Sequence, residues 1–495
     1  MINLLSRINF NLTKKQIGLL LGIFIFQTIF GVLIYNLLTK DKNIIQVSQI
    51  IQISLLPYIF VFLFLSMLAF WVIILCLYNK NLLNIKNVNL IKLSFYILML
   101  FFVIIMVIIG YLTHGEYIRT MLHNNPNDVF MDFFNSIQYG MNPYSKGVIY
   151  PPLINVFYGF LGRFFVKDTL PIFFRDNQMG AMVFTFYILS VYWLLYFSLN
   201  KFTKTYLIKE FELKLLYCLM LLSLPFLFAM ERGNSIILAL IFSILFLVYY
   251  NKERTNNIIA YICLAIAVSI KIIPFVFSLI LLRDRQWKDF ILCSIIILLI
   301  FNIPFIATDG NLLILIENIV ATTRAFQGSI VDPNGTNILV GYGVYVNIEN
   351  TIKALGDILF FDLSDIAKLM KILLIIFSLY IVIMKKTLAQ WKLYTLLCGI
   401  LVLSPGFSAV YNLVYYVIPL ICFLNSKPQN TCINFIYLSL FSLIFIPFIN
   451  IPIPLFQEIS ATHIYPIRIT TLVEGISIIL LSIIVIIDEL RISNK

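Results

Sequence analysis

Long apolar stretches recur along almost the whole chain, and they constrain its fold more than any other feature. About fourteen segments approach the ~20 residues that an α-helix needs to cross a bilayer. Apolar residues make up 61% of the 495 residues and charged residues only 12%, whereas a soluble domain is nearer half apolar and a quarter charged. The runs are continuous rather than alternating, which excludes a closed β-barrel. We therefore expect an all-α polytopic membrane protein with about 12–14 transmembrane helices.

Polar interruptions divide this pattern into three parts. Residues 1–112 are expected to form N-terminal transmembrane helices, and residues 113–180 a first large loop with an interfacial helix. Residues 181–495 hold the remaining transmembrane bundle, with further loops near 307–365 and 450–467. No water-soluble domain is evident, so function is expected in the bundle and in these loops.

Loop charges predict the orientation of the chain. Its 35 basic residues outnumber its 23 acidic ones, for a net charge of +12, and most of the basic residues lie in short loops between apolar runs. If the N-terminus is cytoplasmic, almost all of these loops fall on the cytoplasmic side, as the positive-inside rule expects. The C-terminus is then cytoplasmic, and the loop 113–180 is extracytoplasmic. Topology explains the excess charge, so we expect a multi-pass protein of a bacterial cell membrane, with the lipid bilayer and no nucleic acid as partner.

One pair of apolar segments is short for two separate membrane spans. The apolar pieces within 257–282 are separated by Lys271, and this interruption suggests a half-depth hairpin. The N-terminal segment, residues 1–16, has basic residues before its apolar run and no small-residue cleavage site, which predicts a retained signal anchor. The seven cysteines show no CxxC spacing and the three histidines are dispersed, so no metal site is expected.

The loop 113–180 carries the strongest candidate for chemistry. Asp128 and Asp132 are four residues apart, and on a helix both would lie on one face. Paired carboxylates suit general-base work, because one can be ionised while the other positions it. The alternative is a pair of solvated loop residues, with Asp128 capping the helix that follows Asn127, and the spacing alone favours that alternative. Residues 153–166 have the pattern of an amphipathic helix in the interface, with Arg163 towards the headgroups.

Several motifs resemble glycosyltransferase family 87. The segments are Asp128-Val-Phe-Met-Asp132-Phe-Phe-Asn135, Gly140-Met-Asn-Pro143-Tyr144 and Tyr150-Pro-Pro-Leu153 in the first outer loop, then Glu231-Arg-Gly-Asn234, Lys271-Ile-Ile-Pro274, the basic run Arg283–Lys288, and a weaker echo from Leu403 to Tyr416. The Glu231–Asn234 match is partial, because a glutamine of the family's pattern is absent. The resemblance covers roughly residues 113–425.

This resemblance implies a fold and an activity. Members of the family are polytopic enzymes with a GT-C-type helical bundle and an extracytoplasmic catalytic loop. They move a sugar, such as a mannose-like hexose, from a polyprenyl-phosphate sugar to a lipid-linked or cell-envelope glycan acceptor, with inversion. The roles carried over are Asp128 as general base with Asp132 as the close second, Arg232 and Lys271 as ligands of the donor phosphate, and Tyr144, Tyr150, Asn234 and His123 as substrate-binding residues. No metal or other cofactor is expected.

The cationic candidates also stand on physical grounds. An ionisable residue within a span is costly to bury and suggests function, which applies to Lys271 and Arg232. Arg232 is expected where a helix begins, so that terminal N–H groups add to anion binding. The alternatives are snorkelling to a surface and, for Arg232, pairing with Glu231. A lipid or glycan transporter or flippase, an envelope polysaccharide ligase or polymerase, and a non-catalytic assembly protein remain rival functions.

Overall fold

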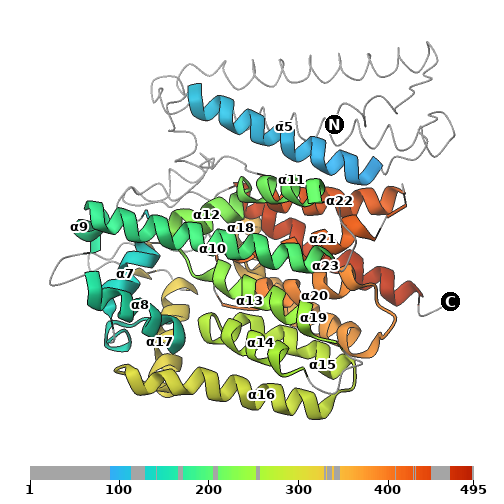
Figure 1. The fold of residues 1–495 in the computed structure, drawn as a ribbon. Helices are drawn as coiled ribbons and strands as arrows, with labels where there is room; N and C mark the ends of the chain where they lie inside the picture. Colours follow the sequence, from blue (N-terminus) through green and yellow to red (C-terminus); the bar gives the residue numbers. More distant parts are fainter. Residues whose placement is uncertain are drawn as a thin grey trace.

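The computed structural model describes residues 90–112, 129–140, 142–165, 171–204, 210–251, 257–327, 330–331, 337–338, 346–359, 361–406, 408–426, 428–429, 431–446 and 469–492. Within them the chain is almost entirely helical (Figure 1). Two two-residue strands, β1 (Ile330–Val331) and β2 (Asn337–Ile338), pair antiparallel. The predicted signal anchor, residues 1–16, lies outside the described residues.

Five of the described helices are long and apolar enough to cross a membrane. They are α5 (Leu90–Leu112), α10 (Gln178–Lys204), α16 (Trp287–Asn302) with its continuation η4 (Ile303–Ala307), α19 (Ser364–Met384) and α23 (Ile469–Ile492). A sixth candidate is a bent pair, α11 (Glu210–Leu221) and α12 (Leu224–Arg232), whose axes differ by 60°. Pro225 stands in the first turn of α12, where a proline is tolerated but cannot continue the preceding helix.

Shorter apolar helices fill the centre of the bundle. They are α13 (Ile236–Tyr249), α14 (Ile258–Ile270), η3 (Ile273–Ser278) with α15 (Leu279–Arg283), α20 (Gln390–Leu403), η5 (Val410–Tyr416) with α21 (Val417–Asn425), and α22 (Cys432–Phe445). Helices α13 and α14 pack against each other, with α10 and α16 on either side. The expected all-α polytopic membrane protein is confirmed.

Burial separates the core from the bilayer-facing helices. Every residue of α20 from Trp391 to Leu403 is buried, and Ile236 and Leu240 of α13 are fully covered. The long helices α10 and α16 instead expose large apolar side chains such as Trp193 and Leu298. Such apolar surface on a long helix is suited to contact with lipid rather than with water.

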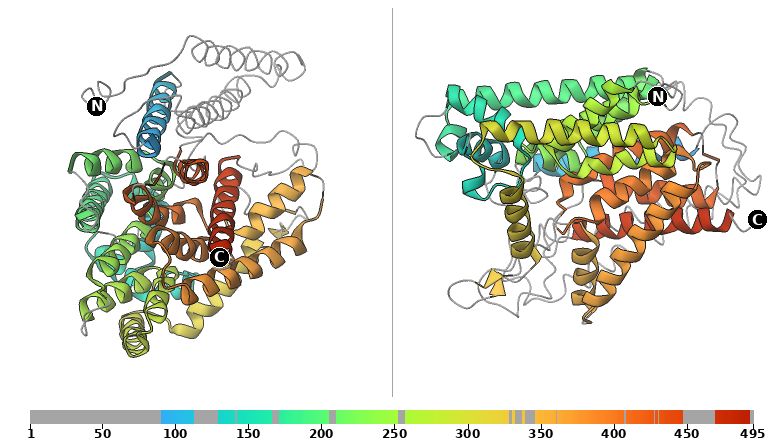
Figure 2. Two further views of the ribbon diagram at one scale, coloured as in Figure 1. Left: turned by 90° about the vertical axis from the view of Figure 1, so that its right-hand side faces the viewer. Right: turned by 90° about the horizontal axis from the view of Figure 1, so that it is seen from below.

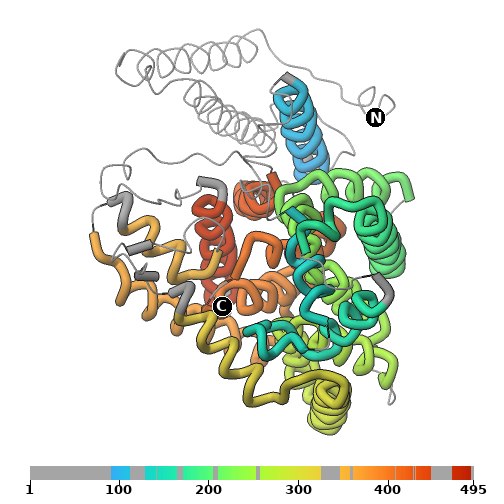
Figure 3. The backbone as a smooth tube through the Cα atoms, turned by 90° about the vertical axis from the view of Figure 1, so that its left-hand side faces the viewer, coloured from blue at the N-terminus to red at the C-terminus, as the bar shows by residue number. Residues whose placement is uncertain are grey.

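Small helices of the loop 113–180 close one end of the bundle. They are α7 (Met131–Tyr139), η2 (Tyr144–Lys146), α8 (Pro152–Phe165) and α9 (Pro171–Arg175). The amphipathic helix expected at 153–166 is therefore present as α8, which buries Ile154 and Tyr158 and exposes Phe160 and Arg163. Figure 3 views the molecule from this end, with α7 and α8 in teal. Helix α17 (Leu312–Gln327) contacts η2 from the side of the later loop.

The chain reverses at Lys271, where the backbone is extended between α14 and η3. The start of α14 and the end of α15 lie at the same end of the bundle. The hydroxyl of Tyr250, which stands between α13 and α14, lies 2.9 Å from Oδ2 of Asp284, which directly follows α15. Arg283 Nη2 donates to the carbonyl oxygen of Lys386 at 2.8 Å, which adds the loop after α19 to this group. Three of the loops predicted to share one side by their charge, those after α13, α15 and α19, thus meet at one end of the bundle, opposite α7 and α8.

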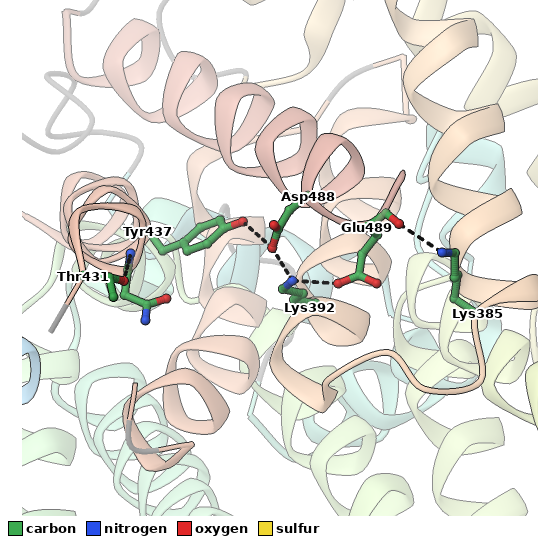
Figure 4. Close-up of polar contacts among 7 residues, drawn as sticks. Lys385, Lys392, Thr431, Tyr437, Asp488 and Glu489 are labelled. Carbon is green, nitrogen blue, oxygen red and sulfur yellow. Dashed lines mark hydrogen bonds and ion pairs between the residues drawn. The ribbon is translucent and has the colours of Figure 1, made fainter. Parts of the chain in front are cut away.

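Buried charges join α20 to the C-terminal helix at this basic end. Lys392 Nζ pairs with Asp488 and lies 2.6 Å from Glu489 Oε1 (Figure 4). The Tyr437 hydroxyl reaches Asp488 at 3.5 Å, and Lys385 Nζ donates to the backbone oxygen of Glu489 at 3.0 Å. Figure 2 (left) shows the bundle from this end, with the C-terminal end of the red helix α23 towards the viewer. Helices α18 (Ile348–Leu359) and α22 pack against α23 as well.

Candidate active site

The first turn of α7 fixes the position of Asp132. Phe130 precedes the helix with a left-handed backbone, φ 62°, and its N–H donates to the carbonyl oxygen of Glu231 at 2.7 Å. The helix begins at Met131, so it does not extend to residue 128, and Asp128 itself lies outside the described residues. The N-cap position that the alternative gave to Asp128 is held by Phe130, whose side chain makes no capping hydrogen bond.

Asp132 forms the centre of a polar cluster. Its Oδ1 lies 2.6 Å from Arg232 Nη2, and its Oδ2 accepts a hydrogen bond from Asn234 Nδ2 at 2.6 Å. The Asp132 and Arg232 side chains are only 15% and 17% exposed, so solvent screens the pair weakly. A buried carboxylate needs such partners, since an unpaired charge there would be very costly.

Arg232 is the last residue of α12, not the first of a helix as expected. A helix C-terminus carries a partial negative charge, which stabilises the guanidinium itself and gives no N–H donors for an anion. Gly233 then adopts a left-handed conformation with φ 63°, and a Cβ there would lie 2.9 Å from Phe133 Cβ. Glycine thus allows the tight turn that places Arg232 and Asn234 on either side of Asp132.

Asn234 joins the cluster to the next helix. Its Oδ1 accepts the backbone N–H of Ile236, the first residue of α13, at 3.0 Å. Its Nδ2 donates to Asp132 and lies 3.4 Å from the Tyr150 hydroxyl. Asn234 is 4% exposed, so this amide is oriented from both sides by groups within the protein.

Lys271 enters the same region from the break between α14 and η3. Its Nζ lies 4.0 Å from the centroid of the Tyr150 ring and 5.6 Å from that of Tyr411 in η5. Both distances are within the range of cation–π attraction. The Tyr411 ring is stacked against Phe228 of α12, with centroids 6.1 Å apart. No carboxylate in the described part of the chain lies within ion-pair distance of Lys271.

The turn that carries Tyr150 is held by its own hydrogen bonds. The Tyr144 hydroxyl donates to the Tyr150 carbonyl oxygen at 3.1 Å, and Asn155 Nδ2 donates to that oxygen at 2.9 Å. Tyr144 is 2% exposed, which gives it a supporting position behind Tyr150 rather than one open to a ligand. Burial raises the pKa of the Tyr144 hydroxyl well above its usual value, despite the hydrogen bond from Asn155, so it stays a donor at neutral pH.

Two residues of the later loop reach this turn, and the sequence analysis missed both. Asp309 Oδ1 and Oδ2 accept the backbone N–H groups of Tyr144 and Ser145 at 3.0 and 2.9 Å. Asn318 Nδ2 donates to the carbonyl oxygens of Tyr144 and Val148 at 3.1 and 3.2 Å. The only sequence signal is the polar Thr308-Asp309-Gly310-Asn311 stretch after a long apolar run, which does not reveal a contact 165 residues away.

The remaining predicted site residues cannot be placed. Asp128 and His123 lie outside the described residues, although Val129, next to Asp128, accepts a hydrogen bond at its carbonyl oxygen from Arg175 Nη1 at 3.3 Å. Of the predicted set, the structure brings together Asp132, Arg232, Asn234, Tyr150 and Lys271. Within the described residues no group of three or more His, Cys, Asp or Glu could hold a metal ion.

These observations define a polytopic membrane protein with an acidic and basic cluster at one end of its bundle. Its residues 149–405, slightly more than half of the chain, match the model of glycosyltransferase family 87. The chain therefore belongs to this family and is a glycosyltransferase. The match includes Tyr150, Arg232, Asn234 and Lys271 and begins after Asp128 and Asp132. No curated protein and no solved structure matches the chain.

Proposed function

We propose that this glycosyltransferase moves a hexose from a polyprenyl-phosphate sugar to a lipid-linked or cell-envelope glycan, with inversion at the anomeric carbon. The observation that carries the proposal is the convergence of Lys271, Arg232 and Asn234 on one end of an apolar bundle. A membrane-bound lipid phosphate reaches such a site without leaving the bilayer. In this proposal the site faces the extracytoplasmic side of a bacterial cell membrane, and both termini are cytoplasmic.

The charges of the cluster support a donor with a single anionic phosphate. The Arg232 guanidinium is already paired with Asp132 at 2.6 Å, so it contributes little net positive charge. Lys271 is held instead by the Tyr150 and Tyr411 rings, which orient the ammonium without neutralising it. A phosphodiester carries one negative charge, and Lys271, which forms no direct ion pair with a carboxylate of the described residues, is the residue proposed to contact it.

The two carboxylates take different roles in this proposal. Both oxygens of Asp132 are engaged, one by Arg232 and one by Asn234, so Asp132 holds these side chains in place. Asp128 is the proposed base. It takes the proton of the acceptor hydroxyl as that oxygen attacks the anomeric carbon. The bond from this carbon to the phosphate oxygen breaks, and polyprenyl phosphate leaves with the electron pair.

The test is transfer by the purified protein in lipid nanodiscs. A panel of radiolabelled polyprenyl-phosphate hexoses, with membrane lipid extract as acceptor, is expected to yield labelled product from at least one donor. Nucleotide sugars are the control donors and are expected to give none. Transfer from a nucleotide sugar alone would overturn the proposed donor class. Movement of the intact labelled lipid across the bilayer without transfer would favour a flippase.

The variant Asp128→Asn tests the base. We expect loss of transfer with normal membrane insertion and an unchanged apparent melting temperature, because the amide cannot accept the proton. Asp132→Asn is the comparison variant, and it is expected to lower both transfer and melting temperature because it removes the negative partner of Arg232. Wild-type turnover by Asp128→Asn would exclude Asp128 as the base.

A further inference from the structure

Two side chains of the later loop, Asp309 and Asn318, form hydrogen bonds to the backbone of the turn at residues 144–148. Asp309 accepts the N–H groups of the first two residues of η2, Tyr144 and Ser145, and thus caps this short helix from 165 residues away. Asn318, one helical stretch further on, donates to the carbonyl oxygens of Tyr144 and Val148. The two bonds to Asp309 satisfy N–H groups that η2 leaves without partners of its own. The Tyr144 carbonyl oxygen also accepts the Gly147 N–H at 3.1 Å, so Asn318 adds a second donor there.

Side-chain packing adds to this contact. A Cβ on Gly310 would lie 2.3 Å from the Tyr144 ring, so the glycine backbone lies directly against that ring. The Phe305 ring approaches Tyr144 with a centroid distance of 5.5 Å. Tyr144 is therefore enclosed by the segment that runs from η4 to α17, and a substitution at Gly310 would displace one of the two.

The turn at residues 144–148 is connected to the polar cluster through Tyr150. The Tyr144 hydroxyl donates to the backbone oxygen of Tyr150 at 3.1 Å. The Tyr150 ring lies 4.0 Å from Lys271 Nζ, and its hydroxyl lies 3.4 Å from Asn234 Nδ2. A displacement of Tyr144 is thus transmitted through Tyr150 to the ammonium group.

We propose that Asp309 is a positioning residue of the glycosyltransferase: it holds the turn at Tyr144 so that the Tyr150 ring keeps Lys271 in place. Asp309 has no contact with the cluster itself, and its effect passes through the turn. The proposal rests on the proposed function of Lys271 as the phosphate ligand. A misplacement of about 1 Å in a positioned group can cost on the order of 10²-fold in rate.

Titration of Asp309 does not disturb this arrangement near neutral pH. Partial burial raises the pKa of its carboxyl, but the hydrogen bonds from the N–H groups of Ser145 and Tyr144 outweigh burial and lower that pKa below its usual value. The stabilisation is present above the unfolded pKa of about 3.9. It is lost only as the pH falls through the still lower folded value. The carboxylate therefore remains an acceptor throughout the range in which transfer is assayed.

The test compares Asp309→Asn and Asp309→Ala with Glu317→Gln. Glu317 is an exposed carboxylate next to Asn318 on α17. Its variant therefore removes a negative charge in the same loop but leaves the hydrogen bonds of Asp309 to the turn in place. Asn keeps one acceptor oxygen and Ala keeps none. We expect kcat/KM for transfer to fall by about threefold in Asp309→Asn and about 10-fold in Asp309→Ala, within the range set by loss of the Tyr150–Lys271 contact itself, and to be unchanged in Glu317→Gln. Equal, complete loss in the Asn and Ala variants would contradict a positioning role.

A second readout does not depend on transfer. Amine-reactive labelling of Lys271, read by mass spectrometry at a reagent concentration that leaves the wild type mostly unlabelled, is expected to rise several-fold in Asp309→Ala. Lys392 labelling, at the far end, is expected to stay constant and reports on global unfolding. Unchanged Lys271 labelling in Asp309→Ala would overturn the inference even if transfer fell. If the wild type shows no transfer but labelling of Lys271 rises in Asp309→Ala, the proposed function is refuted and the positioning role of Asp309 still stands.

Discussion

Two clusters of buried charge stand at opposite ends of the bundle, and they are built differently. The cluster at the basic end uses Lys392, Asp488 and Glu489 on two regular helices, with the cation held between two carboxylates. The cluster at the other end takes its members from helix ends and breaks, with Arg232 paired to Asp132 but Lys271 held by aromatic rings. Helix α13 begins beside the second cluster and runs towards the basic end. Its 14 residues make it about 21 Å long.

The proposed function treats the first cluster as a structural ion network and the second as a ligand site. Charges that satisfy one another within regular helices fix the packing of those helices. In the proposed function, the lysine at a helix break, which is faced by rings and forms no direct ion pair in the described residues, binds an anionic partner. The same residue type thus has opposite consequences at the two ends, and substitutions can test this contrast.

The largest effect is expected for Arg232→Met. This change leaves Asp132 buried with only the Asn234 amide, and breaking one side of a buried ion pair costs about 3–5 kcal/mol. We expect a lowered apparent melting temperature and loss of transfer together, measured by thermal unfolding in detergent and by the donor assay. Arg232→Lys, which keeps the charge, is the control and should recover part of both. Full activity in Arg232→Met would show that the pair is not part of the site.

Lys392→Met should be similarly destabilising, at about 3–5 kcal/mol, because it leaves Glu489 and Asp488 beside each other without their cation. Asp488 is 37% exposed, so water relieves part of its share. The expected result is a lower melting temperature with an unchanged kcat for the protein that remains folded. A fall in kcat without a change in melting temperature would reverse the distinction between the two ends.

Lys271→Met is the matched change at the other end. It removes a cation that has no described carboxylate partner, so we expect little change in melting temperature. Loss of a charge-assisted contact of about 1.5–3 kcal/mol to the donor phosphate corresponds to a ~10–100-fold rise in donor KM. Initial rates over a range of donor concentrations give this value. A large drop in stability without a change in KM would make Lys271 structural, like Lys392.

Substitutions of Tyr150 should give the smallest effect, and two of them separate the contribution of the ring from that of the hydroxyl. Tyr150→Phe keeps the ring 4.0 Å from Lys271 Nζ and removes only a long contact to Asn234 of 3.4 Å, so donor KM should change less than about threefold. Tyr150→Leu also removes the cation–π contact, worth about 0.5–2 kcal/mol, and should raise KM further. Equal effects of the two variants would show that the ring does not orient the ammonium.

Much of the fold followed from local patterns in the sequence. Continuous apolar runs predicted a polytopic helical protein, and the amphipathic pattern at 153–166 predicted α8. Charge counts grouped the basic loops, and three of them, after α13, α15 and α19, do meet at one end. The helical predictions succeeded because the pattern of hydrophobicity over 10–20 residues determines whether an apolar segment is helical.

Predictions that depended on helix boundaries were less accurate. Asp128 was expected on or at the cap of the helix that carries Asp132, yet the helix begins at Met131 behind a left-handed Phe130. Arg232 was expected at a helix start and ends α12 instead. In both cases a contact from outside the segment decides the boundary, namely the Phe130 N–H bond to Glu231 and the close packing around Gly233.

The sequence by itself determined that this chain crosses a membrane as helices, that it carries the motifs of its family, and that Lys271 interrupts an apolar segment. Only the tertiary structure decided that Asp132 pairs with Arg232 across 100 residues and that Asp309 caps the turn at Tyr144 across 165 residues. The physical reason is that burial makes an unpaired charge or backbone N–H costly, but which partner satisfies it depends on which segments the packing brings together.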